Sequence, residues 1–291
     1  MSPGVVTLTV PDSLGGGVSD IEALHALADR REPAERFVMD MGRVGFAKPH
    51  GVLALLLTAR RLSNVSGRRV EMSNIGRQVH SYLERMDFFD AGGDWLAPSQ
   101  SLEEGWDRNP QTPNLLELTS IEGSQDVMNA ISRAERVFSR WLALPDLNGL
   151  LQVLSELCAN IYQHSGDQAG CVMIQKYEEV ARGRTVVSVA VGDLGVGVRA
   201  SLAARHGEIG EEPLDYLCEA MLGRSSRPND RGGLGLRVVE QAAQSSGGSL
   251  WLRSETAAIV GQAFGQASGH RSLCHVPGTQ VAVELYASLP A

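Results

Sequence analysis

The chain has 291 residues, 43% of them hydrophobic and 21% charged, which excludes a globally disordered protein and leaves room for two domains with buried cores. Its formal net charge of −8 argues against a nucleic-acid partner, because nucleic-acid-binding domains usually carry a clustered basic face. No segment has the pattern of a signal peptide or the length of a membrane span, so we expect a cytoplasmic protein with no membrane partner.

The first part of the chain, residues 1–91, alternates between strand and helix patterns. Val5–Val10 alternates at period two, as in a half-buried strand, whereas Gly51–Ser63 has the pattern of a strongly apolar helix. The expected strands cover 5–10, 36–41 and 68–74, and the expected helices cover 20–31, 51–63 and 77–90. This alternating order predicts a small sheet with helices packed on it.

Residues 92–114 have no periodicity and are rich in Gly, Pro, Ser, Asn and Asp, a composition typical of a linker. Residues 115–291 form the second predicted domain, in which helices are followed by mostly neighbouring strands, and no pattern assigns residues 255–276. The expected helices cover 124–142, 154–164 and a segment from 237, and the expected strands cover 115–121, 169–180, 185–195, 249–255 and 279–287. This order predicts an α/β sandwich, so the expected fold class of the chain is mixed α/β.

The helix at 154–164 places Glu156, Asn160 and His164 at four-residue intervals, which stacks these polar side chains on one face. Leu154 and Leu157 belong to a separate apolar stripe. The polar face is either solvated surface or a site. A carboxylate and a carboxamide one turn apart can hold Mg²⁺ through oxygen and position a reacting group.

Three further pieces of the second domain carry glycines or polar groups at the ends of predicted elements. Asp193 ends a strand and is followed by Gly195 and Gly197, the segment Arg231–Leu236 enters a helix, and Thr279 starts the last strand. Glycines let backbone amides approach a ligand, and the first amides of a helix form a phosphate site. A carboxylate such as Asp193 can accept a hydrogen bond from the exocyclic amine of a base. Together these pieces predict a purine-nucleotide pocket.

The order and spacing of these motifs resemble the GHKL superfamily of ATPases, or Bergerat fold, which includes histidine kinases, gyrase B and the anti-sigma-factor serine kinases. The resemblance covers roughly Leu115–Ala287. It implies ATP and Mg²⁺ as cofactors, with Asn160 holding the metal, Asp193 receiving the adenine amino group and Thr279 supporting that group through water. The residues that it implies for the phosphate loops, or for the lid at 225–231 and the phosphates beneath it, are Gly195, Gly197, Gly232, Gly233, Gly235, Arg224, Arg227 and Arg231.

Within this superfamily the chain is most similar to the anti-sigma-factor serine kinases. A sensor histidine kinase is disfavoured because no dimerisation helix pair with an exposed His-Glu pair precedes the ATPase motifs. In the serine kinase branch, the carboxylate at the position of Glu156 is the expected general base for a serine hydroxyl. His164 would then have a structural or capping role rather than that of a phosphoacceptor.

Residues 1–91 resemble a STAS domain, the fold of anti-sigma-factor antagonists, through the strand, loop, apolar helix and short strand of 36–72 and the last helix at 81–90. Classical antagonists end that loop in Asp-Ser-Ser-Gly, and a serine at the helix start takes a phosphate. Here the aligned residues are Lys48–Gly51, with His50 in place of the serine, so the usual acceptor hydroxyl is absent. We interpret the domain as a docking or scaffold module, with phosphorylation of His50 as the alternative.

The two resemblances imply a partner-switching regulator that phosphorylates a serine or threonine on a STAS-type protein or another protein of a sigma-factor pathway. The chain would then be an ATP-dependent protein serine/threonine kinase. Two alternatives stay open: an ATP-gated binding module without phosphotransfer, and a switch that only hydrolyses ATP. A homodimer is compatible with all three of these functions.

Overall fold

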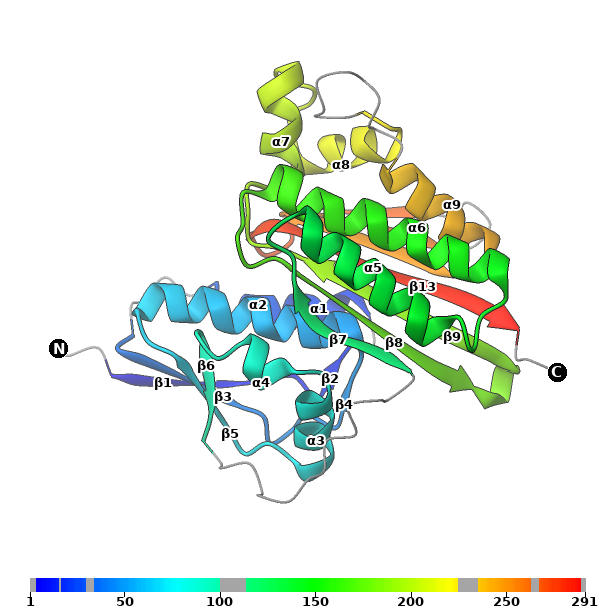
Figure 1. The fold of residues 1–291 in the computed structure, drawn as a ribbon. Coiled ribbons are helices and arrows are strands. Elements are labelled where there is room, and N and C mark those ends of the chain that lie inside the picture. Colours follow the sequence, from blue (N-terminus) through cyan, green and yellow to red (C-terminus); the bar gives the residue numbers. More distant parts are fainter. Residues whose placement is uncertain are drawn as a thin grey trace. The chain divides into compact units, whose positions relative to one another are not determined.

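A computed structural model describes residues 4–15, 17–29, 34–99, 114–224, 235–262 and 267–288. The chain divides into two compact units, Met1–Thr112 and Pro113–Ala291, and both combine helices with sheets (Figure 1). The mixed α/β fold class is therefore confirmed. No helix within the described ranges is long and apolar enough to cross a membrane.

The first unit is built on a four-stranded parallel sheet in the order β1-β3-β5-β6. Two shorter strands, β2 and β4, form a separate parallel pair. The strands are β1 (Val5–Thr9), β2 (Ser13–Leu14), β3 (Arg36–Asp40), β4 (Phe46–Ala47), β5 (Val70–Ser73) and β6 (Leu96–Pro98). The helices are α1 (Val18–Ala26), α2 (Pro49–Ser66), α3 (Arg77–Arg85) and α4 (Phe88–Ala91).

Helix α2 is the central helix of this unit. It begins at Pro49, whose ring suits the first helical position, and ends at Ser66, where it is capped by Gly67 with a left-handed φ of 67°. Every residue from Gly51 to Ala59 is buried, as expected for a helix that is apolar on all sides. Gly51 lies so close to β2 that a Cβ there would be 2.3 Å from the carbonyl oxygen of Leu14, so the packing of α2 requires glycine at this position.

Two expectations for the first unit are corrected. Leu96–Pro98, placed in the linker by composition, forms strand β6 and pairs with β5, where Leu96 is buried. The helix expected over 77–90 is two helices, because Asp87 between them adopts a left-handed φ of 59°. Short polar residues tolerate this conformation, so Asp87 can break the helix without a glycine.

The second unit is a seven-stranded sheet in the order β12-β11-β10-β13-β9-β8-β7, with antiparallel pairing throughout. Its strands are β7 (Leu115–Ser120), β8 (Cys171–Glu179), β9 (Arg184–Gly192), β10 (Ser249–Glu255), β11 (Ala257–Gln262), β12 (Ala267–His270) and β13 (Val276–Ser288). Its helices are α5 (Ser124–Phe138), α6 (Leu144–Asn160), α7 (Gly197–His206), α8 (Pro213–Met221) and α9 (Gly235–Ser245), with a π-helical turn η1 at Ile161–Ser165 and a 3-10 turn η2 at Val180–Arg182.

Helices α5, α6 and α9 pack on one face of this sheet (Figure 1). Alternate residues of the strands point into the core between the layers, as do the apolar stripes of the helices. The core includes Phe138, Leu150, Leu154, Leu157, Val172, Ile174, Val187, Val189, Val191, Val239, Leu250, Leu252, Val281 and Val283. The layered sandwich expected for this domain is the architecture observed.

Within residues 255–276, which no pattern assigned, Ala257–Gln262 forms β11 and Ala267–His270 forms β12, and these strands extend one edge of the sheet. Helix α8 packs on this extension: a Cβ on Gly269 of β12 would lie 2.9 Å from Cδ2 of Leu214.

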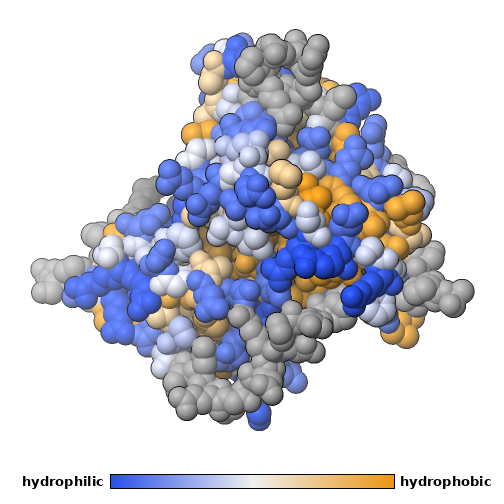
Figure 2. All heavy atoms as spheres, viewed as in Figure 1, coloured by the Kyte–Doolittle hydropathy of each residue, from blue (hydrophilic) through white to orange (hydrophobic). Residues whose placement is uncertain are grey.

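Figure 2 shows hydrophobic side chains among hydrophilic ones on the side of the second unit where α5 and α6 lie. Leu144 and Met128 are among the exposed apolar residues of these helices, and scattered exposure of this kind is normal.

Candidate functional site

The second unit contains a cleft of about 870 Å³, open to solvent, at the end of the sheet where α6 and β9 both terminate. Apolar side chains line its inner part, including Leu157, Ile161, Val191 and Leu202. Its polar residues are Glu156, Asn160, His164, Ser165, Asp193, Ser201, Arg224 and Thr279. A mostly apolar cleft with a few convergent polar groups is the usual form of a small-molecule site.

Glu156 and Asn160 lie on the last turns of α6, one turn apart, and both are half-buried. The neighbouring Leu154 and Leu157 are buried in the core, which turns the polar stripe of α6 toward the cleft. After Asn160 the chain passes directly into the π-helical turn η1, and the wider backbone of such turns often marks functional sites. His164, one turn further, also lines the cleft.

Asp193 is buried in the turn that follows β9, and this turn is fixed by its own backbone amides. The amide of Asp193 donates to Thr279 O at 3.0 Å, and the amide of Gly195 donates to Oδ1 of Asp193 at 2.8 Å. The amide of Leu194 donates to Oδ2 of Asp167 at 2.7 Å, and that of Val196 to Ser165 O at 2.8 Å. These amides are satisfied within the protein, so they are not free donors for a phosphate.

The glycines beside Asp193 are required by close packing of the backbone. A Cβ at Gly195 would lie 1.9 Å from Ser165 O, and one at Gly278 would lie 2.2 Å from Asp193 O. Gly197 has a left-handed φ of 78° and would meet the hydroxyl of Ser254 at 2.8 Å. The resemblance assigned Gly195 and Gly197 to phosphate loops, but the geometry gives them a different part, which is to let three chain segments meet around Asp193.

Ser254 ties these segments together from β10. Its hydroxyl, which is buried, donates to Gly278 O at 2.7 Å and accepts from the amide of Val198 at 3.0 Å. It thereby joins the start of α7 to the start of β13, next to Thr279, which also lines the cleft. Ser254 supports the shape of the site without being one of its lining residues.

Gly235 opens α9 against the carboxylate of Glu156. A Cβ at residue 235 would be only 2.6 Å from Oε2 of Glu156, so glycine lets this helix end and the carboxylate share the same corner of the cleft. Arg224 lies at the cleft as well, where its Nε donates to Oε2 of Glu219 at 2.7 Å. Arg227, Arg231, Gly232 and Gly233 of the expected lid and phosphate loop lie outside the described residues.

The structure thus brings seven of the expected residues to one cleft: Glu156, Asn160, Asp193, Gly197, Arg224, Gly235 and Thr279. Gly195 contacts this set through its amide, which donates to Oδ1 of Asp193. Sequence reasoning missed Asp167, Ser165, Ser254 and Gly278, whose contacts hold the turn at Asp193 and the segments beside it. The first three stand in no motif of the sequence, and only Gly278, a glycine directly before Thr279, carried a local signal.

The donor atoms of the cleft bear on the metal expected at Asn160. No group of three or more His, Cys, Asp or Glu residues able to hold a metal occurs in the described ranges, so these residues form no all-protein metal cage. Mg²⁺ is commonly held by one or two protein oxygens together with substrate phosphates and water. The carboxamide of Asn160, which lines the cleft, fits a metal that arrives with a nucleotide, and it leaves the carboxylate of Glu156 available as a base.

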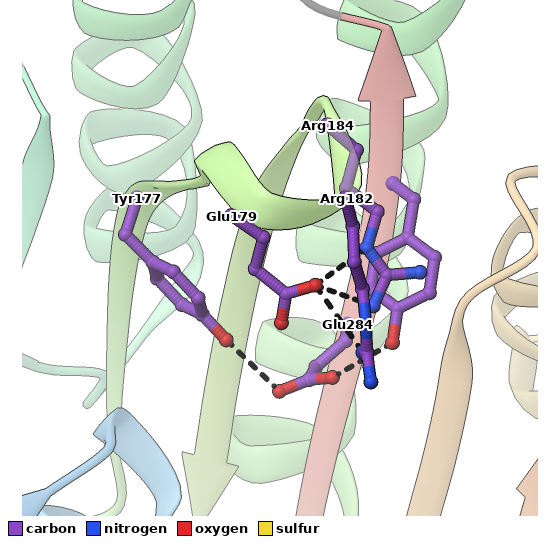
Figure 3. A network of polar contacts seen from close by, with 6 residues as sticks. Tyr177, Glu179, Arg182, Arg184 and Glu284 are labelled. Atoms are coloured by element: carbon purple, nitrogen blue, oxygen red, sulfur yellow. Dashed lines mark hydrogen bonds and ion pairs between the residues drawn. The ribbon is translucent and has the colours of Figure 1, made fainter.

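A second polar network lies at the other end of the strands, around Glu179, Arg184 and Glu284 (Figure 3). Arg184 is the first residue of β9 whereas Asp193 follows its last, a separation of about 30 Å along a strand. Oε2 of Glu179 accepts from Nε of Arg184 at 2.7 Å, and Oε1 of Glu284 accepts from the hydroxyl of Tyr177 at 3.2 Å. This network stabilises the β8–β9 hairpin and is separate from the cleft.

The sequence of the region that contains the cleft matches a known protein family. Residues 145–286 match the family described as Histidine kinase-, DNA gyrase B-, and HSP90-like ATPase, and this range includes every cleft residue named above. The match agrees with the sandwich of sheet and helices and with the motif order along the chain. Residues 145–286 are therefore a GHKL-type ATPase domain, and membership of this family implies that the domain binds ATP.

Proposed function

We propose that the second unit binds Mg·ATP in this cleft and transfers the γ-phosphoryl group to a serine or threonine hydroxyl of a STAS-type partner protein in the cytoplasm. One observation supports the proposal most directly. The carboxylate of Glu156 lies one helical turn from Asn160 and against Gly235, at the start of α9. A base, an oxygen ligand for a metal and a helix N-terminus, which favours anions, therefore meet at one corner of the cleft.

In the proposed reaction Glu156 accepts the proton of the partner hydroxyl. The hydroxyl oxygen forms a bond to the γ-phosphorus while the bond from that phosphorus to the β–γ bridging oxygen breaks, which leaves ADP and a phosphoester. Asn160 would hold Mg²⁺, and the bound metal would neutralise part of the charge of the phosphates. Asp193 would accept from the amino group of adenine, with Thr279 beside it.

We further propose that the first unit is a STAS-like docking or scaffold module. Its helix α2 begins at Pro49 with Lys48 before it, and its second residue is His50, so the start of the helix offers no hydroxyl to phosphorylate. Gly51 lets the start of this helix pack closely against the backbone of β2, because a Cβ at this position would clash with the carbonyl oxygen of Leu14. The module would either occupy the partner surface of the kinase in cis or recruit a second protein.

An ATP-gated binding module without phosphotransfer is the second candidate, and the packing of α7 and α8 favours it. Tyr216 and Ala220 of α8 form a small apolar cluster with Leu202 of α7, apart from the main core. Leu202 and Ala220 also line the cleft. A nucleotide that contacts this small cluster could shift α7 and α8 and so change a partner surface without any chemistry.

Transfer of label from ATP separates the two candidates. Wild-type protein and the Glu156→Gln variant would be incubated with ATP labelled at the γ-phosphate, Mg²⁺ and purified STAS-type proteins, with nucleotide binding measured in parallel. A kinase labels a partner serine or threonine in the wild type only, while both proteins bind ATP. Wild type that binds ATP, changes its affinity for a partner and labels none of them would support the gated module instead.

A further inference from the structure

The side chain of Asp167 connects the turn that carries Asp193 to the segment that follows α6. Its Oδ2 accepts from the amide of Leu194 at 2.7 Å, and its Oδ1 accepts from the amide of Ala169 at 3.0 Å. The amide of Asp167 itself donates to the hydroxyl of Ser165 at 2.9 Å. Both carboxylate oxygens are therefore engaged with backbone amides on two sides of the residue.

The chain of contacts continues to the π-helical turn. The hydroxyl of Ser165 donates to Ile161 O at 2.6 Å, and Ile161 directly follows Asn160. The carbonyl of Ser165 accepts from the amide of Val196 at 2.8 Å. Asp167 and Ser165 thus fix the Asp193 turn to the end of α6, on which the metal-binding candidate Asn160 lies.

We infer that Asp167 is a positioning residue that holds the carboxylate of Asp193 in place and so sets selectivity for a 6-aminopurine nucleotide over a 6-oxopurine nucleotide. This inference rests on the proposed function, in which Asp193 reads the purine ring. Asp167 is not a residue of the cleft wall, and it acts through the amide of Leu194, the residue next to Asp193.

Selectivity of this kind depends on a rigid acceptor. The amino group of ATP donates to a carboxylate, whereas the 6-oxo group of ITP presents a second acceptor to it and is repelled. Both effects weaken steeply when the carboxylate can move by about 1 Å. Hydrogen bonds from amides to an ionised carboxylate are stronger than those between neutral groups, so the two amide bonds of Asp167 are well suited to prevent that movement.

The alternative is that Asp167 only stabilises the loop at 165–169. Asp126 provides a matched control, because its Oδ2 accepts from the amides of Glu122 and Gly123 at 3.0 and 3.1 Å and its helix, α5, contributes no residue to the cleft. Both aspartates are half-buried and both hold a loop through two backbone amides. Loss of either aspartate should lower stability, but only Asp167 accepts a hydrogen bond from the residue next to Asp193.

The test measures dissociation constants of ATP and of ITP for the wild type, Asp167→Ala and Asp126→Ala, together with the thermal midpoint of each. We expect the wild type to prefer ATP by roughly tenfold or more, as for an ionic hydrogen bond. Asp167→Ala should lose most of that preference, mainly through weaker binding of ATP. Asp126→Ala should keep the wild-type ratio, even where its midpoint falls as far.

An unchanged ratio of ATP to ITP affinity in Asp167→Ala would overturn the inference. If Asp167→Ala does not fold, Asp167→Asn, which retains one oxygen acceptor, takes its place with an intermediate ratio expected and an unchanged one contradicting the inference. A wild type that binds no nucleotide, or that binds ATP and ITP equally, would instead overturn the assigned role of Asp193, and with it the basis for any role of Asp167.

Discussion

Oε2 of Glu156 lies in the space that a side chain at Gly235 would occupy, 2.6 Å from the position of a Cβ there. The two residues are 79 positions apart, on α6 and α9, and the packing of these helices brings them to one corner of the cleft. This contact explains why a glycine opens α9, and it gives the candidate base a fixed position.

Substitution Gly235→Ala should therefore lower activity more than stability. Alanine favours a helix over glycine by about 1 kcal/mol, but its methyl group would push the Glu156 carboxylate aside. We expect phosphotransfer or ATP turnover to fall at least tenfold, as for loss of a positioned base, with the thermal midpoint nearly unchanged. Gly149→Ala is the control, because a Cβ at this helical glycine meets nothing within 4 Å and activity should stay at the wild-type level.

Asn160→Ala should weaken nucleotide binding only when Mg²⁺ is present. The carboxamide is expected to hold the metal, and a lost contact to a charged group costs about 1.5–3 kcal/mol, or tenfold or more in affinity. Equilibrium titration with ATP in Mg²⁺ and again in a chelator measures the difference. The control is Gln163→Ala. This change removes an exposed carboxamide that lies three residues after Asn160 and donates to the hydroxyl of Tyr162. Equal losses in both media would contradict a metal role for Asn160.

Ser254→Ala tests the support of the site. The change leaves Gly278 O and the amide of Val198 without their shared partner in a buried position. Buried groups left unsatisfied in this way cost about 1–3 kcal/mol, so the midpoint of denaturant unfolding should fall by a corresponding amount. Ser245→Ala removes an exposed hydroxyl that bonds only within its own helix, to Gln241 O, and should change stability little. A loss no larger than that of the control would show that the bridge does not stabilise the domain.

The ion pair of Glu179 and Arg184 predicts a dependence of stability on pH. The hydrogen bond from Arg184 lowers the pKa of Glu179 below its ordinary value of 4.5. The pair therefore stabilises the fold above that value, and its contribution disappears as pH falls through the lowered pKa. Since both side chains are partly exposed, the contribution should be about 1 kcal/mol or less.

Thermal midpoints at neutral pH and below roughly pH 3 measure this contribution. Glu179→Gln should be less stable than the wild type at neutral pH and equally stable in acid. The exposed Glu208→Gln provides the control, with no difference expected at either pH. A deficit in Glu179→Gln that persists unchanged in acid would show that the charge of the pair is not its cause.

Much of the second unit could be predicted from its sequence because periodicity and turn residues mark its elements. The polar stripe Glu156–Asn160 and the Asp-x-Gly-x-Gly segment at 193–197 are local patterns, and the structure places both at one cleft. Asp167 and Ser254 could not be found in the same way, because their roles depend on contacts with residues 27 and 24 positions away. The hairpin of β11 and β12 gave no clear signal either, since its short strands contain glycines and small polar residues that weaken strand patterns.

Equilibrium titration of the wild type and of Asp193→Asn with Mg·ATP shows most directly whether the cleft of the second unit binds ATP through Asp193. The wild type should bind Mg·ATP saturably, and the affinity of the variant should be lower by about tenfold or more, with both proteins folded. Wild type that does not bind ATP, or a variant that binds it equally well, would contradict an ATP site at Asp193.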